Sequence, residues 1–415
     1  MDNQESKVIT IPYCPHEFQR LFHNDPTRFR LLLAGIRGGK TIAGANETIK
    51  KATERRQDIG IFGPTYPMLR VARDVILHYL PQELILEHNK SEKRIYLTCG
   101  SCLHFFSCED PDSIRGVGLD YAWIDEGGYV KDEAYKVIRG RIAQKRGGLI
   151  ITTTPKGVGG WLYRFYNNCA DPLQKDFSLI KFRSVDNPYF SDEEIERLKE
   201  EYPEQFYRQE LEAEFIDEAA QVFRRIDDCI TSKLKDGGNN CAVGIDLGKR
   251  QDYTVLTAID RQSKKQIGYD RFYRLDWGMQ KQRIKNFCDK YKGLALMDST
   301  GVGDPIFDDL VREGMKIVGY KFSNQSKNSL IDALSIATEQ EKIGLANIPE
   351  QTAELKGFRY KISQAGNFKY GTQAGHDDIV IALALAWWNI KTYGTGVGVI
   401  ISGGERETTA KKMIW

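Results

Sequence analysis

The sequence predicts an α/β protein built in two successive parts, and three observations support this prediction. Residues 31–41, LLLAGIRGGKT, have the pattern of a buried strand, a glycine-rich turn and the start of a helix. Residues 121–126, YAWIDE, form a second apolar run that ends in two acids. Beyond residue 240, apolar runs again end in aspartates. We therefore expect a first domain with a central, mainly parallel sheet, followed by a second α/β domain.

Length and composition limit the class of protein. At 415 residues the chain is long for one core, which favours two domains. Its 41% hydrophobic and 28% charged residues are typical of a soluble globular protein, and a net charge of +2 restricts any nucleic-acid contact to local patches. No signal peptide is evident, and the longest apolar run, residues 379–388, is too short to span a bilayer. We expect a cytoplasmic protein that does not use a membrane.

Residues 34–41, AGIRGGKT, match the phosphate-binding loop pattern G-x-x-x-x-G-K-[ST] except at the first position, where Ala34 replaces glycine. In such a loop, backbone N–H groups and a helix start surround the phosphates. Lys40 would reach the β- and γ-oxygens, and the Thr41 hydroxyl would ligate Mg²⁺. The alternative is an ordinary strand, turn and helix with a chance Gly-Lys-Thr. The candidate ATP-binding residues of the first half are Gln19, Gly35, Arg37, Gly38, Gly39, Lys40, Thr41 and Asp125.

Two acids follow the apolar strand at residues 121–124. Asp125 would hold Mg²⁺ through water, and Glu126 would orient and deprotonate the water that attacks the γ-phosphate. Turns are rich in acids, so the pair alone is weak evidence. It stands about 85 residues after the Gly-Lys-Thr loop, with strands between them, and a P-loop ATPase requires such a partner.

Three further side chains could complete this site. Gln19, on a predicted short helix, can hydrogen-bond the adenine edge in both directions; the alternative is an exposed helix position. Arg115, before the strand at residues 121–124, and Arg37, inside the phosphate-binding loop, are candidate arginine fingers. Either would neutralise charge that develops on the γ-phosphate. For either arginine, the alternative is a surface position or a structural salt bridge.

A further buried strand, residues 149–153, runs into Thr154-Pro155-Lys156-Gly157. Hydroxyls at the end of a strand beside a hydrolysis site can sense whether the γ-phosphate is present, which makes Thr152, Thr153 and Thr154 candidates for a coupling role. The alternative is a polar strand end with a Pro-Gly turn. Two helices that follow Ser191 and Pro203 are typical of a lid that closes the first half.

These motifs resemble the ATPase domain of the large terminase subunit of tailed bacteriophages, the motor that packages viral DNA. The residues that carry the resemblance are HEFQ with Gln19, AGIRGGKT, Arg115-Gly116 before AWIDE, and TTTPKG. The resemblance implies an ASCE-type P-loop ATPase in which Ala34 and Arg37 are ordinary variation. It also implies that Thr152 to Thr154 belong to a coupling motif, and that Arg115 acts on the ATP of a neighbouring subunit in a ring.

The second half supplies aspartates from separate elements. Asp246 and Asp298 end apolar strands, Asp252 follows six residues after Asp246, and Asp377 and Asp378 open a buried helix. Buried carboxylates are costly to ionise unless cations pair with them, so converging aspartates indicate bound metal. Two hard cations held there could activate a water and stabilise the departing 3′-oxygen in phosphodiester cleavage. The alternative for each aspartate is a turn residue or a helix cap.

The order of these elements is typical of the RNase H-like nuclease fold, and the region resembles the nuclease domain of the same terminase family. The resemblance implies Asp246, Asp298 and Asp378 as catalytic metal ligands, with Asp252 and Asp377 as auxiliary acids near the second metal. A predicted hairpin could lie along the DNA backbone, although alternating basic residues are common on exposed hairpins. Its candidate side chains are Arg359, Lys361, Lys369 and Tyr370.

The sequence thus predicts a motor domain at residues 1–214, a linker at 215–240, a nuclease domain at 241–392 and a flexible tail at 393–415. The expected function is ATP-driven translocation of double-stranded viral DNA into a procapsid, with metal-dependent cutting of the concatemer. The expected cofactors are ATP, Mg²⁺ in the ATPase site, and Mg²⁺ or Mn²⁺ in a two-metal nuclease site. The resemblance implies double-stranded DNA, the portal protein, the small terminase subunit and further copies in a ring as partners, in the host cytoplasm.

Two other functions fit part of this pattern. One is a P-loop DNA helicase or translocase with an accessory nuclease, which would need a second motor domain. The other is a non-enzymatic assembly protein with degenerate sites. Intact Lys40, Thr41, Asp125 and Glu126 count against the second.

Overall fold

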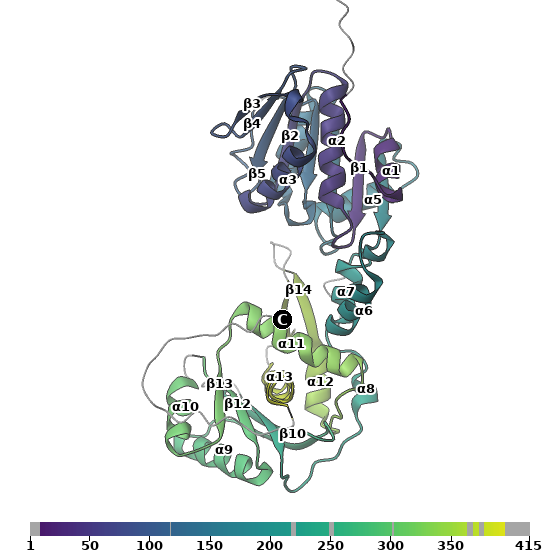
Figure 1. Cartoon of the computed structure of the whole chain (residues 1–415). Helices are drawn as coiled ribbons and strands as arrows, with labels where there is room; N and C mark the ends of the chain where they lie inside the picture. Colours follow the sequence, from purple (N-terminus) through teal and green to yellow (C-terminus); the bar gives the residue numbers. More distant parts are fainter. Residues whose placement is uncertain are drawn as a thin grey trace, which may run out of the picture. The chain divides into compact units, whose positions relative to one another are not determined.

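The computed structural model divides into two compact units (Figure 1). The structure describes residues 9–116, 118–216, 221–248, 253–300, 303–362, 368–372 and 377–394. The first unit is Met1–Val222 with Arg359–Gly371, and the second is Phe223–Phe358 with Thr372–Trp415. The division falls inside the segment predicted to be a linker. Residues 359–371 group with the first unit, whereas the sequence placed them in the second domain.

The first unit is built on an eight-stranded sheet in the order β3-β4-β5-β2-β6-β7-β1-β8. The six strands from β5 to β8 in this order run parallel, while β3 and β4 run antiparallel at one end. The predicted mainly parallel sheet is confirmed. The strands are β1 Phe29–Ala34, β2 Asp58–Gly63, β3 Ile85–Asn89, β4 Arg94–Leu97, β5 Cys102–Ser107, β6 Tyr121–Asp125, β7 Gly148–Thr153 and β8 Phe177–Phe182.

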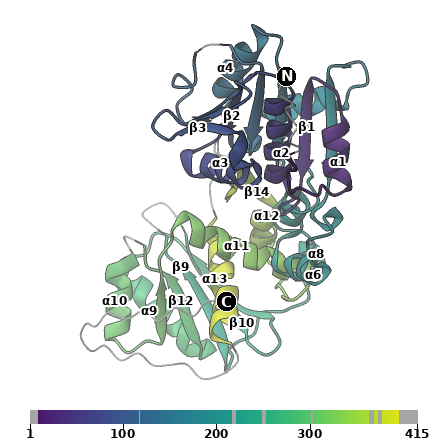
Figure 2. The same ribbon diagram turned by 45° about the horizontal axis from the view of Figure 1, so that its top comes forward.

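Helices cover both faces of this sheet, which explains the nearly continuous apolar runs in its central strands. Helices α1 Glu17–Asn24, α2 Lys40–Glu54 and α3 Tyr66–Tyr79 pack on one face. Figure 2 shows α2 beside β1 with α1 nearby. Helices α4 Asp132–Ala143 and α5 Trp161–Ala170 pack on the other face.

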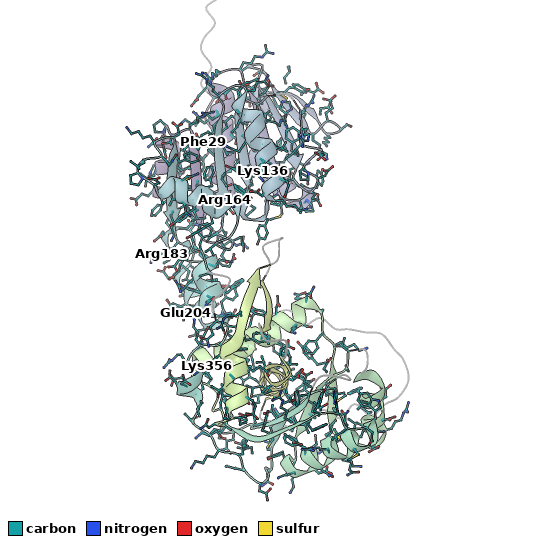
Figure 3. All side chains as sticks on the ribbon, turned by 180° about the vertical axis from the view of Figure 1, so that it is seen from behind. Phe29, Lys136, Arg164, Arg183, Glu204 and Lys356 are labelled. Atoms are coloured by element: carbon teal, nitrogen blue, oxygen red, sulfur yellow. The ribbon has the colours of Figure 1, made fainter. Side chains whose placement is uncertain are left out.

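An ion-pair bridge joins the two helices on that second face. Asp132 accepts from Lys136 at 2.5 Å and from Arg164 of α5 at 2.7 Å; the two basic residues are labelled in Figure 3. Helices α6 Asp192–Glu201 and α7 Glu204–Glu210 follow β8, where the sequence predicted lid helices. Short 3₁₀ helices, labelled η, are present at η1 Gln82–Leu84, η2 Gly127–Tyr129 and η3 Ser184–Asp186.

The second unit has a five-stranded mixed sheet in the order β11-β10-β9-β12-β13. The antiparallel meander of β9, β10 and β11 continues through β9 into parallel β12 and β13. This is the predicted order of a strand with a terminal aspartate, a hairpin, and a second strand with a terminal aspartate. The strands are β9 Cys241–Asp246, β10 Thr254–Asp260, β11 Gln266–Phe272, β12 Leu294–Asp298 and β13 Ile317–Tyr320.

Helices also cover both faces of this second sheet. On one face lie α9 Trp277–Tyr291 and α10 Gly303–Arg312. On the other lies α13 Asp378–Tyr393, which packs on β9, β10 and β12. Gly244 in β9 permits this approach, since a Cβ there would lie 2.0 Å from the carbonyl oxygen of Ala382. The remaining helices of the unit are α8 Ile226–Cys229, α11 Asn324–Glu339 and α12 Pro349–Gly357.

The predicted hairpin is present as β14 Phe358–Ile362 paired with β15 Phe368–Thr372. The side chains of Lys361 and Lys369 lie outside the described part of the structure, so their proposed DNA contact stays a prediction. In the described residues, no helix combines the length and apolar character needed to cross a bilayer.

Candidate nucleotide and metal sites

The phosphate-binding loop joins the end of β1 to the start of α2. Gly39 has a φ of 77° and Arg37 a φ of 59°, so two residues of the loop adopt left-handed backbone that turns the chain sharply. Lys40 is only 6% exposed, and its Nζ donates to the carbonyl oxygen of Gly35 at 2.9 Å. Burial lowers the pKa of Lys40, against the opposing effect of Glu126 and Asp125. The loop therefore places a buried ammonium group beside its own backbone.

Residues far along the chain fix the shape of this loop. The Ser184 hydroxyl donates to the carbonyl oxygen of Ile36 at 2.6 Å, and the Asn187 amide donates to that of Arg37 at 2.6 Å. The backbone N–H of Ile36 donates to the carbonyl oxygen of Glu210 at 2.6 Å. Gly35 is required because a Cβ there would lie 2.3 Å from the Ser184 hydroxyl. The segment after β8 and the end of α7 thus hold the loop.

Helix α1 brings Gln19 to the same loop. The Gln19 side-chain amide donates to the carbonyl oxygen of Gly39 at 3.1 Å, while its oxygen accepts from the backbone N–H of His16 at 3.0 Å. His16 Nε2 lies 3.3 Å from the carbonyl oxygen of Gly38. The structure therefore shows Gln19 supporting the loop, and its predicted contact with adenine stays a prediction.

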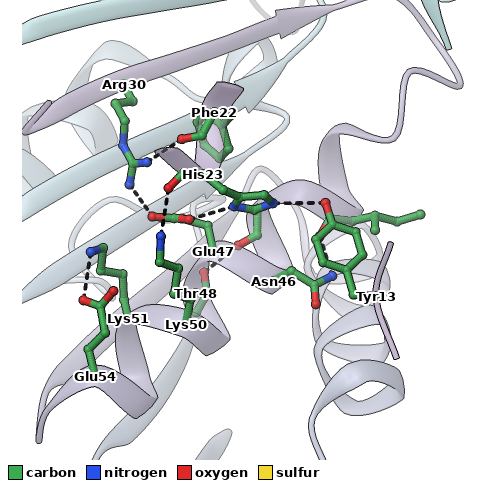
Figure 4. A network of polar contacts seen from close by, with 12 residues as sticks. Tyr13, Phe22, His23, Arg30, Asn46, Glu47, Thr48, Lys50, Lys51 and Glu54 are labelled. Carbon is green, nitrogen blue, oxygen red and sulfur yellow. Dashed lines mark hydrogen bonds and ion pairs between the residues drawn. The ribbon is translucent and has the colours of Figure 1, made fainter. Parts of the chain in front are cut away.

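A buried polar network holds α1 against α2 (Figure 4). His23 Nδ1 lies 2.7 Å from Glu47 Oε2, and Arg30 donates to Glu47 Oε1 at 2.6 Å and to the carbonyl oxygen of Phe22 at 2.7 Å. The Tyr13 hydroxyl lies 3.0 Å from His23 Nε2. Burial opposes ionisation of Glu47, but the hydrogen bond with His23 and the charge of Arg30 lower its pKa overall. The network fixes the helix that carries Gln19.

Asp125 joins three elements of the site. It is 4% exposed and accepts a hydrogen bond from the Thr41 hydroxyl at 3.1 Å and from the Thr152 hydroxyl at 2.6 Å. The Trp123 indole N–H donates to the Thr152 oxygen at 2.8 Å. Burial and the neighbouring charge of Glu126 raise the pKa of Asp125. The start of α2 and the ends of β6 and β7 therefore meet at one carboxylate.

Glu126 follows Asp125 with a φ of 51°, a left-handed backbone conformation that is uncommon for this residue type and concentrates at functional sites. The Thr153 hydroxyl accepts from the backbone N–H of Gly128 at 2.9 Å and donates to the carbonyl oxygen of Thr154 at 2.8 Å. The end of β7 is thus bonded to the turn that carries Glu126.

Lys156 and Glu210 form a buried ion pair that the sequence did not predict. Lys156 Nζ lies 2.5 Å from Glu210 Oε1, and the two side chains are 6% and 9% exposed. Glu210 ends α7, and its backbone oxygen also accepts from Ile36 in the phosphate-binding loop. The pair therefore links the segment after β7 to the lid and, through the lid, to the loop.

The two candidate arginine fingers differ in setting. Arg37 is exposed on the loop. The Arg115 side chain is 69% exposed and donates to Asp112 at 2.7 Å. Among the described residues, the structure records no hydrogen bond from either guanidinium to Asp125 or Glu126.

In the second unit, strand pairing brings two of the predicted metal ligands together. Strands β9 and β12 are parallel with Ile245 opposite Met297, so Asp246 and Asp298 occupy the next position on neighbouring strands. Asp378 is the first residue of α13, which packs on β9. Burial and the charges of Asp378 and Asp298 raise the pKa of Asp246 well above its usual range.

Hydrogen bonds from neighbouring residues orient each of these carboxylates. The backbone N–H of Thr300 donates to Asp298 at 2.8 Å, and that of Tyr253 donates to Asp378 at 3.3 Å. Lys327 of α11 donates to Asp377 at 2.7 Å. Lys327 is a cation that the sequence did not identify, because a lysine in a helix carries no signal of its own.

The end of β9, the end of β12 and the start of α13 supply the candidate metal ligands of the second unit. Among the described residues, no three Asp, Glu, His or Cys side chains stand in metal-binding geometry. Residues 249–252, which include Asp252, and residues 373–376, which include His376, lie outside the described part of the structure. Carboxylate oxygens are nevertheless the donor type that Mg²⁺ and Mn²⁺ prefer, so the chemistry of the residues fits a hard divalent cation.

Comparisons with known proteins find a resemblance to large terminase subunits. A family model described as terminase large subunit, T4likevirus-type, N-terminal, matches residues 31–227. The large terminase subunit of Thermus virus P23-45 is 26% identical over 430 residues, which cover 90% of this chain and 87% of that protein. Over nine-tenths of its length, the chain is therefore similar to a large terminase subunit. The large terminase subunit of Escherichia phage T5 is 25% identical over 289 residues, which cover 64% of each chain.

A solved large terminase shares the fold. This protein, from a thermophilic bacteriophage, superposes with a TM-score of 0.54 at 16% identity, over 91% of this chain and 98% of that chain. The predicted resemblance to the large terminase family and the predicted fold class are confirmed. The family favours a packaging enzyme with ATPase and nuclease activity over a helicase or a non-enzymatic assembly protein.

We expect Thr152→Val to destabilise the chain by about 1–3 kcal/mol, because it removes a hydrogen bond to buried Asp125 and leaves the Trp123 indole N–H without its acceptor. The free energy of unfolding in urea measures this change. Thr53→Val, on the exposed side of α2, is the control and should change stability by less than about 0.5 kcal/mol. Equal effects of both substitutions would contradict the assigned bond.

We expect Glu47→Gln to destabilise the chain at neutral pH by about 3–5 kcal/mol, since it leaves Arg30 buried without its partner charge. Folding lowers the pKa of Glu47, so its stabilisation is present above the unfolded pKa and is lost as the pH falls. The difference from wild type should therefore shrink below about pH 4.5 in thermal unfolding experiments. Glu54→Gln, in the exposed pair with Lys51 on the same helix, should cost less than about 1 kcal/mol at any pH.

Proposed function

We propose that the chain moves double-stranded viral DNA by hydrolysing ATP in the first unit and cuts the DNA with the carboxylates of the second unit. The observation that supports this most strongly is the bonded group of Thr41, Asp125 and Thr152 beside buried Lys40, in a chain that resembles large terminase subunits. The resemblance to large terminase subunits supports a role in DNA packaging with ATPase and nuclease activity.

In the ATPase site, Lys40 holds the β- and γ-phosphates, while Thr41 and Asp125 bind Mg²⁺. The metal supplies neutralisation of charge on the phosphate oxygens. Glu126 orients the attacking water and accepts its proton. The large terminase of the same thermophilic bacteriophage has been solved in complex with ATP-γ-S, and we assign ATP to this chain.

Coupling between hydrolysis and DNA movement runs through the end of β7. Thr152 bonds Asp125, and Thr153 bonds the turn after Glu126, so loss of the γ-phosphate alters contacts at this strand end. Lys156, three residues later, transmits the change to α7 through Glu210. This path supports the role assigned to Thr152, Thr153 and Thr154, and adds Lys156 and Glu210 to it.

The arginine finger is assigned to Arg115, with Arg37 as the second candidate. The exposure of the Arg115 side chain supports a role on the ATP of a neighbouring subunit. Such a role requires a ring of copies. The portal protein and the small terminase subunit complete the proposed assembly, which works in the host cytoplasm.

In the nuclease site, Asp246, Asp298 and Asp378 hold the metal ions, with Asp377 and Asp252 as auxiliary acids. Two divalent cations supply activation of water and stabilisation of the leaving 3′-oxygen. The neighbouring strand ends of β9 and β12 position Asp246 and Asp298, and the start of α13 positions Asp378. Lys327 restrains Asp377 and adds a positive charge beside the group.

Glu126→Gln should lower ATP turnover by about 10²-fold or more, because the amide cannot accept the proton of the attacking water. Metal-dependent nicking of plasmid DNA should be unchanged. The control is Glu133→Gln on the exposed face of α4, which should leave both activities intact. ATP turnover at the wild-type rate in the Glu126 variant would remove this residue as the base.

Asp298→Ala should have the opposite effect. It removes a ligand at the end of β12, so nicking in Mg²⁺ or Mn²⁺ should fall by about 10²-fold or more while ATP turnover persists. Asp308→Ala, exposed on α10, provides the control in the same unit. A variant lacking the Asp298 carboxylate that still cuts DNA would refute the metal assignment.

A further inference from the structure

The first unit contains a small pocket that lies apart from the ATPase site, between α3 and the hairpin of β3 and β4. Basic side chains from two elements line it, and none of its lining residues is acidic. The basic residues that line the pocket are Arg70, Arg73, His88, Lys90 and Lys93, and Tyr66 lies beside them.

The positive charge of this pocket is largely uncompensated. Arg73 pairs with Asp74 at 2.8 Å, but Arg70, Lys90 and Lys93 have no ion pair among the described residues. Burial lowers the pKa of His88, and the charges of Arg73 and Lys90 lower it further, as expected where cations crowd together. Such a region attracts anions.

The pocket lies at the edge of the sheet that carries the phosphate-binding loop. Helix α3 begins where β2 ends, and β2 runs parallel to β6, which ends at Asp125. The backbone N–H of Phe105 donates to the carbonyl oxygen of Lys93 at 3.0 Å, which places the turn between β3 and β4 near the carboxyl end of β5. The N-terminus of α3 is capped by Thr65 and by Glu109, whose carboxylate accepts from the backbone N–H of Tyr66 at 3.2 Å, so the positive charge of the pocket comes from its basic side chains.

We propose that this pocket binds phosphate groups of double-stranded DNA, as a contact that holds the duplex against the motor domain. The inference rests on the proposed function in DNA translocation. With a net charge of only +2, the chain must bind DNA through local patches, and this patch has unpaired cations. By contrast, two lysines near the end of α2 are bonded within the chain: Lys50 donates to the carbonyl oxygen of His23, and Lys51 pairs with Glu54.

The contact should be independent of base sequence. Lysines and arginines that touch phosphates position the duplex without reading its bases. Each phosphate contact adds about 0.9 to the slope of log affinity against log salt, through release of bound counterions. The change in that slope when cations of this pocket are removed therefore counts the contacts that they make.

The test is the double variant Lys90→Gln/Lys93→Gln of the full chain. Binding of a short mixed-sequence duplex is measured by fluorescence anisotropy over a series of salt concentrations, in EDTA so that no DNA is cut. We expect the slope to fall by about 1.8 and the affinity at 0.1 M salt to fall about tenfold or more. ATP turnover without DNA should be unchanged, because neither lysine lies in the ATPase site.

The matched control is Arg146→Gln/Lys175→Gln. These exposed cations precede β7 and β8, so they lie at the amino ends of the strands, whereas the phosphate-binding loop lies at the carboxyl ends. Arg146 also has a left-handed φ of 51°, close to the 55° of Lys93. The control should keep the wild-type slope. An equal fall in both variants, or an unchanged slope in the Lys90/Lys93 variant, would overturn the proposal.

Two further outcomes separate this inference from the proposed function. Weaker binding of inorganic phosphate without any change in the DNA slope would assign the pocket to a free anion and overturn the DNA contact. A wild-type chain that binds no duplex would contradict the proposed translocase as well. Wild-type binding with the expected change in slope supports both.

Discussion

The buried carboxylate of Asp125 is the constraint on which the ATPase site depends. A charged group at this depth is costly unless hydrogen bonds and cations surround it. The protein supplies two hydroxyl donors, one from the start of α2 and one from the end of β7, with Lys40 nearby. Because these elements come from distant parts of the chain, the carboxylate also fixes their relative positions. The same group that stabilises the fold is thus placed to bind metal.

The phosphate-binding loop depends equally on segments that follow the sheet. Ser184, Asn187 and Glu210 bond its backbone, and Gln19 and His16 approach it from α1. Any movement of the lid therefore changes the loop directly. The Lys156 and Glu210 pair connects the same lid to the end of β7. A nucleotide-dependent change at the loop accordingly has a bonded route to the rest of the motor domain.

The strands and the elements that carry the acids could be predicted because they rest on local patterns. Leu31 to Leu33 and residues 121–124 are buried on both faces and so form uninterrupted apolar runs. The bonds that hold the loop could not be predicted. Ser184 and Glu210 lie about 150 or more residues beyond Ile36, and an isolated serine or glutamate carries no sign of its distant partner. For Gln19 the sequence predicts a contact with adenine, whereas its side-chain bonds to Gly39 and His16 depend on the folded position of α1.

The most direct test of the account is a crystal structure with Mn²⁺ and a non-hydrolysable ATP analogue, with the metal located by anomalous scattering. The account predicts one peak between the γ-phosphate and the oxygens of Thr41 and Asp125, and further peaks between Asp246, Asp298 and Asp378. The absence of metal peaks from both the ATPase site and the nuclease site would contradict the claim that these carboxylates bind metal. A Lys40 side chain that points away from the phosphates would contradict the assigned nucleotide site.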